Sequence, residues 1–365
     1  MLTNGTFFLP GPTEVRPEIL REMARPMLPH RSAAFEEIYA RCDAGLRPIF
    51  RSARPVYIAS ASATGLMEGA IRCAPTGTVL SLVNGAFSER FAQVAASCSR
   101  TVVRDDVELG QHHTPERVSA LLERSGARVV TLTHSETSTG ALNDIEAIAR
   151  TVHAHGAVIL VDSVTGLAGA PLEVDAWQLD FAFTGSQKAL AIPPGLALGV
   201  ASQRFIDAAE RNSDRGTYFD LVEFEKYALK NQTPNTPAIS LFYALAAQVE
   251  AIAAEGIEAR WQRHLAMQAI TLAWVEQMAA EVHPAFGVLA PADGRSPTVT
   301  CVTLPPALTG TAVAAATAQL GYVIGAGYGA LRERTIRIGH MGDHTEHGLS
   351  HCLAAVRRAV ESLRA

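Results

Sequence analysis

The chain has only three lysines, and one of them, Lys188, lies in the largely apolar stretch FTGSQKALAIPPG (183–195). Arginine supplies the other 28 of the 31 lysine and arginine side chains. A lysine amine can lose its proton and form an imine with a carbonyl group, whereas a guanidinium cannot. Lys226 and Lys230 lie among acidic residues, as expected of a solvated surface, but no acid follows Lys188 within a helical turn. Lys188 is therefore a candidate for covalent chemistry, although codon bias alone could make lysine scarce.

Two other polar residues stand near the ends of apolar runs. Asp162 ends AVILVD (157–162), and Thr137 lies in THSETSTG (133–140), just after RVVTLT (128–133). Ligands of open α/β sheets bind at the carboxyl ends of the strands, where we expect Thr137, Asp162 and Lys188 to meet. Pyridoxal phosphate needs a lysine for its imine and a carboxylate that keeps its pyridine nitrogen protonated. Asp162 taken alone is as well explained as a helix cap, so the prediction depends on the combination.

The elements that must position these residues fall into three parts. Residues 1–15 are predicted to be an extended arm. Residues 16–255 alternate short apolar runs with amphipathic segments, which predicts a large α/β domain whose mainly parallel sheet is covered on both faces. Residues 256–365 are predicted to form a small α+β domain. The expected strands are 78–83, 128–133, 157–162, 180–185, 296–304 and 334–339, and the expected helices are 115–124, 144–155, 238–284 with a break near Gly256, 312–321 and 344–364.

Composition excludes several classes of function. A formal net charge of −5 and a pI near 6.2 give no electrostatic case for nucleic acid or an anionic membrane as a partner. We find no signal peptide and no apolar run of about 18 residues. The five cysteines lack C-x-x-C spacing, which favours a reducing cytoplasm. His340, His344 and His347 are interpreted as exposed polar residues at the start of the last helix, so we predict no metal site.

Six motifs then occur in order along the chain. They are LPGPTEV (9–15), THSETSTG (133–140), VDSV (161–164), TGSQKAL (184–190), NTPAISL (235–241) and RIGHMG (337–342). Together they resemble the class V aminotransferases, of the aspartate-aminotransferase fold (fold type I), from residue 7 to the C-terminus. The most similar branch is the alanine–glyoxylate, serine–glyoxylate and serine–pyruvate group. The resemblance implies a large domain with a mainly parallel seven-stranded sheet and a small C-terminal α+β domain.

The resemblance also implies how the cofactor is bound. Lys188 would carry pyridoxal 5′-phosphate covalently as an aldimine, and once released by substrate it would move a proton as a base. Asp162 would pair with the pyridinium nitrogen. Val164 would pack beneath the ring, Phe87 of NGAFSER (84–90) would stack on its other face, and Thr137 would reach the ring hydroxyl or its surroundings.

The resemblance implies that the phosphate is bound by the backbone N–H groups of Ala63 and Thr64, at the start of a helix, and by the Gln187 side chain. It also implies that Asn235 and Thr236 of a neighbouring subunit contact the phosphate. The protein would thus be a homodimer with shared active sites. Relatives often have glycine in the turn where Ala61 and Ala63 stand here, which leaves the local geometry open because alanine resists positive φ.

Arg337 would hold the substrate α-carboxylate with a two-pronged hydrogen bond, and Pro10 and Gly11 would lie close to the substrate. The alternative for Arg337 is a surface arginine at a strand end.

The implied activity is transamination from a small amino acid, alanine or serine, to a small 2-oxo acid, glyoxylate or pyruvate. The alternatives are a 2-aminoethylphosphonate or ureidoglycine transaminase and, without catalysis, a pyridoxal-phosphate-binding subunit of a larger complex, because some relatives are labelled as a soluble hydrogenase subunit. A cysteine desulfurase or lyase of the same fold would need a reactive cysteine on a loop, and there is none between Cys301 and Cys352.

Overall fold

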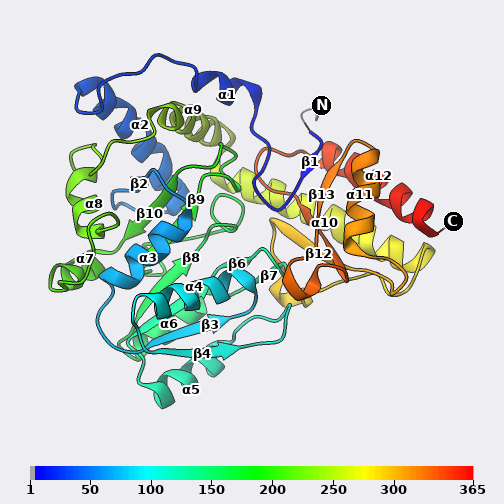
Figure 1. Cartoon of the computed structure of the whole chain (residues 1–365), viewed down its shortest axis with the longest axis horizontal. Helices are drawn as coiled ribbons and strands as arrows, with labels where there is room; N and C mark the ends of the chain where they lie inside the picture. The colour runs from blue at the N-terminus through cyan, green and yellow to red at the C-terminus, as the bar shows by residue number, and fades with distance from the viewer. Residues whose placement is uncertain (1–4, 365) are drawn as a thin grey trace.

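The computed structural model describes residues 5–364 and arranges them around two sheets (Figure 1). The larger sheet has seven strands, in the spatial order β2 (Tyr57–Ala59), β10 (Ala197–Ala201), β9 (Phe181–Gly185), β8 (Val158–Asp162), β5 (Val129–Thr133), β3 (Val79–Val83) and β4 (Val102–Asp106). The smaller sheet has the order β1 (Phe7–Phe8), β13 (Val323–Ala326), β14 (Thr335–Gly339), β12 (Val299–Thr303) and β11 (Gly287–Val288). A short pair, β6 (Ser135–Glu136) with β7 (Ala141–Leu142), follows β5.

The larger sheet confirms the predicted mainly parallel α/β architecture. Neighbouring strands β9, β8, β5, β3 and β4 are parallel, and only β10 runs antiparallel to its neighbours β9 and β2. The four strands predicted from continuous apolar runs are β3, β5, β8 and β9, and every residue in them is buried. Burial on both faces is what such runs require, because their apolar side chains point alternately to either side.

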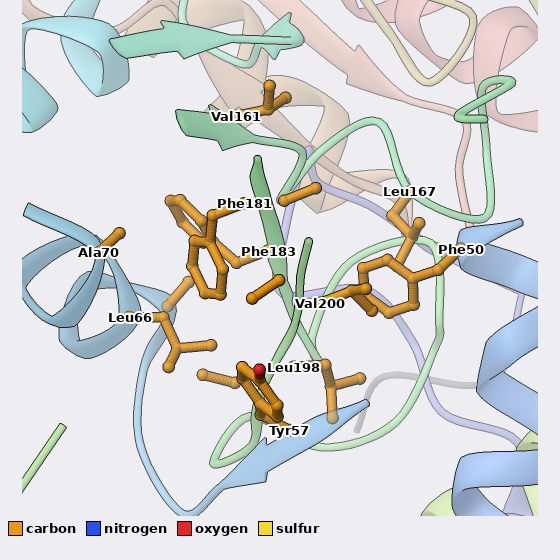
Figure 2. Packing of buried hydrophobic residues seen from close by; sticks show 14 of the residues in the cluster. Phe50, Tyr57, Leu66, Ala70, Val161, Leu167, Phe181, Phe183, Leu198 and Val200 are labelled. Carbon is orange, nitrogen blue, oxygen red and sulfur yellow. The ribbon is translucent and has the colours of Figure 1, made fainter. Parts of the chain in front are cut away.

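Helices cover both faces of the larger sheet (Figure 1). The helices up to residue 255 are α1 (Pro17–Glu22), α2 (Ala33–Phe50), α3 (Ala63–Cys73), α4 (Ala86–Ser97), α5 (Pro115–Ser125), α6 (Ile145–Ala154), α7 (Gln203–Glu210), α8 (Leu221–Ala228) and α9 (Ile239–Glu255). Figure 2 shows Leu66 of α3 beside Phe181 and Phe183 of β9, while Phe50 of α2 approaches the sheet near Val200. Fully burying one such side chain stabilises a fold by about 1.5–3 kcal/mol, so this packing holds the strand ends firmly.

The chain leaves the larger sheet through a long helical segment that breaks where the sequence predicts. Gly256, with φ of +83°, separates α9 from α10 (Ile257–Glu281). The rest of the C-terminal part contains the short 3₁₀ turns η1 (Ala292–Gly294) and η2 (Gly329–Leu331) and the helices α11 (Gly310–Gln319) and α12 (Glu346–Arg364). A second hydrophobic cluster lies here, separate from the core of the larger sheet. The limits 16–255 and 256–365 for two domains stay a prediction.

The N-terminal segment joins the C-terminal sheet. β1 pairs in parallel with β13, as Figure 1 shows where the first strand lies beside the orange β13. Phe8 of β1 is fully buried in the second cluster, and its ring stacks on His344 with 4.2 Å between ring centroids. The arm therefore contributes a strand before its next residues cross toward Lys188.

Of His340, His344 and His347, two are not exposed, contrary to the sequence-based expectation. His340 and His344 are buried, and only His347 lies on the surface. His340 Nε2 lies 2.9 Å from Thr300 Oγ1, and His344 stacks on Phe8. They precede α12 in the chain, but His340 contacts β12 and His344 contacts β1. Within residues 5–364, no cluster of His, Cys, Asp and Glu side chains has the arrangement of a metal site.

In the described part of the chain, we find no helix with the length and apolar character needed to cross a membrane.

Candidate active site

A cavity lies where β5 and β8 end and where the chain turns after β9. Thr133 and Asp162 are the last residues of β5 and β8, and Lys188 follows the end of β9 by three residues. Eight of the residues that the sequence singled out line this one cavity, namely Ala63, Thr64, Phe87, Thr137, Asp162, Val164, Gln187 and Lys188. The parallel topology brings them together, because it gathers the carboxyl ends of successive strands at one edge.

Lys188 is buried, and the N-terminal segment covers it. Its Nζ donates a hydrogen bond to the carbonyl oxygen of Pro10, and its own carbonyl accepts one from Thr13 Oγ1 at 3.1 Å. Burial, followed by the positive charge of Arg337, lowers the pKa of Lys188 to about 8. At pH 7 roughly a tenth of the amines would be neutral, against far less than a hundredth for an ordinary lysine. The environment therefore makes Lys188 a usable nucleophile and base.

Asp162 presents a buried carboxyl group to the same cavity. One oxygen, Oδ1, accepts a hydrogen bond from the N–H of Val164 at 2.8 Å. No side chain among residues 5–364 donates a hydrogen bond to the other oxygen or forms an ion pair with it. Burial raises the pKa of Asp162 to about 7, and the nearby charge of Glu136 adds to this effect. A positively charged N–H group placed against this carboxyl would favour its ionised form.

Phe87 is positioned by a buried glutamate that the sequence reasoning missed. The Glu136 carboxylate accepts hydrogen bonds from the N–H groups of Phe87 and Ser88, at 3.1 and 3.0 Å, in the first turn of α4. It also accepts one from Ser138 Oγ at 2.6 Å. A negative charge suits this position because a helix N-terminus carries free N–H groups. The only sequence signal for this contact was an acidic residue inside THSETSTG, and the helix that it contacts, α4, begins 50 residues earlier in the chain.

The start of α3 offers unpaired donors to the cavity. The N-cap residue, Ser62, makes no side-chain capping hydrogen bond. The N–H groups of Ala63 and Thr64 have no acceptor within the described chain, and both residues line the cavity. Neither Ala61 nor Ala63 has positive φ, so the absence of glycine at these positions imposes no strain. The arrangement fits an anionic group, which would satisfy donors that are otherwise free.

Arg337 belongs to the central strand of the smaller sheet and reaches toward the larger one. Its Nε donates to the carbonyl of Ala326 at 3.0 Å, and Nη1 donates to the carbonyl of Thr137 at 3.4 Å. The side chain is half-buried, and in the described structure no carboxylate pairs with it. The alternative of a simple surface arginine is therefore wrong. A half-buried guanidinium without a protein anion suits a ligand carboxylate.

Gly11 leaves room for the lysine. Its φ is +111°, and a Cβ at this position would lie 2.5 Å from each of Cδ, Cε and Nζ of Lys188. Gly11 and Pro10 thus touch the lysine directly, although neither lines the cavity on its other side. The segment acts as a cover over the lysine.

Asn235 and Thr236 lie elsewhere. Both are exposed on the loop before α9, and they are not part of the lining around Lys188. Arg31 fixes this loop by donating hydrogen bonds to the carbonyls of Thr233 and Pro234, at 2.7 and 3.0 Å. One chain alone does not bring Asn235 and Thr236 to its own cavity.

The structure adds further lining residues that sequence reasoning did not single out, namely Ser62, Met67, Arg90, Thr133, Ser135 and Thr165. Arg90 follows Phe87 by three residues on α4, and its Cζ lies 5.1 Å from the centre of the Phe87 ring. That spacing in NGAFSER was a usable signal, because residues three apart share a helix face. Thr165, whose Oγ1 lies 2.5 Å from that of Thr137, had no such signal.

The chain is similar to known proteins in both sequence and fold. Residues 68–316 match the family model described as Aminotransferase class-V. An uncharacterized aminotransferase of Methanocaldococcus jannaschii is 35% identical, with 97% of this chain and 92% of that protein covered. A protein named soluble hydrogenase, small subunit, from Synechococcus sp. is 37% identical, over 80% of this chain and 78% of its own. The solved structure of alanine–glyoxylate aminotransferase from Nostoc sp. superposes with a TM-score of 0.91 at 28% identity, over 97% of this chain and 95% of that one.

Other relatives, at 28–29% identity, are named as glyoxylate transaminases of L-aspartate, (S)-ureidoglycine and serine, from Paracoccus denitrificans, Bacillus subtilis and Arabidopsis thaliana. They cover 92–98% of this chain and 86–90% of their own.

Proposed function

Because this chain belongs to the class V aminotransferases, a family of enzymes that depend on pyridoxal phosphate, we propose that it transfers an amino group from alanine or serine to glyoxylate or pyruvate. One observation carries the proposal. A buried lysine with a lowered pKa shares its cavity with a buried carboxyl, and an unpaired arginine stands at the edge. Burying ionisable groups lowers the stability of a fold, so a protein that serves only as a scaffold has no reason to keep this combination.

The residues present fit the cofactor. Lys188 would hold it covalently, Asp162 would face its ring nitrogen, and Phe87 and Val164 would contact the ring. Its phosphate would meet the free N–H groups at the start of α3 and the side chain of Gln187; Thr137 would lie near the ring hydroxyl. The unpaired donors of α3 and the unmatched oxygen of Asp162 are complementary to a phosphate and a protonated ring nitrogen, respectively. When bound, the cofactor withdraws electrons from the amino acid and thereby acidifies its Cα–H bond.

The protein side chains then divide the work. Arg337 binds the substrate α-carboxylate and so orients Cα toward the cavity. The amine of Lys188 accepts the proton that leaves Cα, which its lowered pKa allows at neutral pH. Asp162 keeps the positive charge on the ring nitrogen. Pro10 and Gly11 cover the lysine and limit the access of water to it.

The substrate class is supported by the names of relatives that match most of this chain. The Nostoc structure is named for alanine and glyoxylate, and serine is the named donor of one plant relative. (S)-Ureidoglycine, the named donor of the Bacillus subtilis relative, is the main alternative, followed by 2-aminoethylphosphonate. The desulfurase branch is disfavoured by the thiol of Cys301, because the thiol is buried on β12 and burial raises its pKa to about 11. A thiol in that state is a poor nucleophile.

The experiment that tests the function uses purified protein loaded with pyridoxal phosphate. Wild type should show a visible absorption band, and alanine or serine should bleach it while glyoxylate restores it. Borohydride reduction should fix the cofactor on the peptide that contains Lys188. Lys188→Ala should lose the band, whereas Lys226→Ala, a change of an exposed lysine that pairs with Glu223, should keep it.

Two outcomes would reject the proposal in different ways. A protein that takes up no cofactor would not be an aminotransferase of this mechanism. A coloured protein that no amino donor bleaches would favour the alternative of a cofactor-binding subunit, which the hydrogenase-named relative suggests.

We also propose a cytoplasmic homodimer in which Asn235 and Thr236 complete the partner's phosphate site. Both residues are exposed and lie outside the cavity of their own chain, which supports this arrangement. Mixing inactive Lys188→Ala protein with Thr236→Ala protein should restore activity, since one site of each mixed dimer would be intact. If activity never exceeds that of Thr236→Ala alone, the shared site is wrong.

A further inference from the structure

Tyr328 bridges the two sides of the candidate site. It follows β13, and the residue is 39% exposed. The ring centroid lies 5.6 Å from that of Phe87, which belongs to α4 of the larger sheet. The Arg337 Cζ lies 5.5 Å from the Tyr328 ring centroid. One side chain thus contacts both the aromatic residue proposed to contact the cofactor and the arginine proposed to bind the substrate carboxylate.

The backbone around Tyr328 is held firmly. Gly327 donates its N–H to the carbonyl of Thr335 at 2.8 Å, and a Cβ on Gly327 would lie only 2.0 Å from the carbonyl oxygen of Leu331. Leu331 donates its N–H to the carbonyl of Tyr328 at 3.0 Å. The position of the Tyr328 Cα is therefore set by backbone contacts, which do not depend on the ring.

The ring itself is not locked into a core. Among aromatic rings and cationic side chains, its described neighbours are Phe87 and Arg337, and 39% of the residue's surface is exposed. A cation above an aromatic face is attracted to it, yet the N–H edges of the guanidinium stay free for a carboxylate. We therefore expect a substrate whose carboxylate is bound by Arg337, and whose Cα lies near Phe87, to approach the Tyr328 ring.

We propose that Tyr328 is the specificity-determining residue that restricts this site to amino acids and 2-oxo acids with small side chains. The inference rests on the proposed function, since it assumes that Arg337 binds the substrate carboxylate. The Tyr328 ring occupies the rim beside that carboxylate, where a longer side chain would have to displace it. Removing the ring should open this space without changing the guanidinium or the lysine.

The test measures equilibrium binding of inert carboxylates, which need no catalytic turnover. Isothermal titration calorimetry on the cofactor-loaded protein would compare propionate with 3-phenylpropionate. Wild type should prefer propionate. Tyr328→Ala should shift the ratio of the two dissociation constants toward 3-phenylpropionate by about ten-fold or more, a typical size for a change in pocket fit. Tyr328→Phe should keep the wild-type ratio, because the ring and not the hydroxyl fills the space.

Two controls make the result specific. Leu320→Ala changes another side chain of the C-terminal part that is also 39% exposed, and it should leave the ratio unchanged. Arg337→Gln should weaken both ligands together. An unchanged ratio in Tyr328→Ala, or wild type that binds neither carboxylate, would overturn the inference. Failure of the proposed function would appear separately, as carboxylate binding with no transamination of any amino donor.

Discussion

Replacing Gly11 by alanine should damage the site through a single methyl group. The added Cβ would lie 2.5 Å from three atoms of the Lys188 side chain, well inside van der Waals contact. Because the methyl is fixed to the backbone, the lysine has to move. Its hydrogen bond to the Pro10 carbonyl would then be lost, and its Nζ would leave the position that faces the cavity.

Two separate effects contribute to the magnitude. A non-glycine residue at φ of +111° costs about 1–3 kcal/mol in backbone strain. Displacing a catalytic amine by about 1 Å costs on the order of 100-fold in rate. We therefore expect Gly11→Ala to lower kcat/KM for alanine by about 10- to 100-fold, with a modest loss of stability. The assay is steady-state transamination, together with urea unfolding of the same protein.

Gly5→Ala is a matched control. Gly5 also has positive φ, +86°, but a Cβ there would meet nothing within 4 Å. It therefore carries comparable backbone strain in the same segment without any contact with Lys188. If Gly11→Ala and Gly5→Ala show the same kcat/KM, the close approach of Gly11 to the lysine has no catalytic role and the reasoning fails.

Two further predictions concern buried titratable groups. Glu136→Gln should lower the free energy of unfolding by about 2–4 kcal/mol in urea titrations, because an amide cannot accept all the hydrogen bonds at the start of α4. Glu146→Gln, which changes an exposed ion pair, should alter the free energy of unfolding by less than about 0.5 kcal/mol. Equal losses in the two variants would contradict the argument. Burial lowers the pKa values of His134 and His340 to about 4, so between pH 6.5 and 4 the unfolded chain binds more protons and stability falls as the pH falls. From pH 7 to 5 each histidine should contribute a loss of about 1–2 kcal/mol in the free energy of unfolding. His340→Asn should therefore make the decline of stability with falling pH shallower, whereas His347→Asn, a change of an exposed histidine, should not. A free energy of unfolding that stays constant over this range would refute the burial of these histidines.

Secondary structure was predictable where local pattern and burial agree. β3, β5, β8 and β9 are continuous apolar runs, which a strand buried on both faces requires. β10, with the sequence ALGVA, is rich in small residues of low strand propensity, and the edge strand β4 ends in RDD, so neither stood out. Both are strands because they pair with other strands, β10 with β9 and β2, and β4 with β3. The same reason explains β1, whose two residues pair with a strand more than 300 positions later.

For the site, the sequence by itself determined which side chains gather at the strand ends. Lys188, Asp162 and Thr137 follow successive predicted strands, and parallel topology places such positions at one edge. Only the tertiary structure decided that Gly11 touches Lys188, that Glu136 positions Phe87, and that the lone arginine of β14 stands beside Tyr328. It also decided that His340 and His344 are buried. These contacts arise from tertiary packing, which no local periodicity encodes, and the stacked pair Phe8 and His344 stands 336 residues apart in the chain.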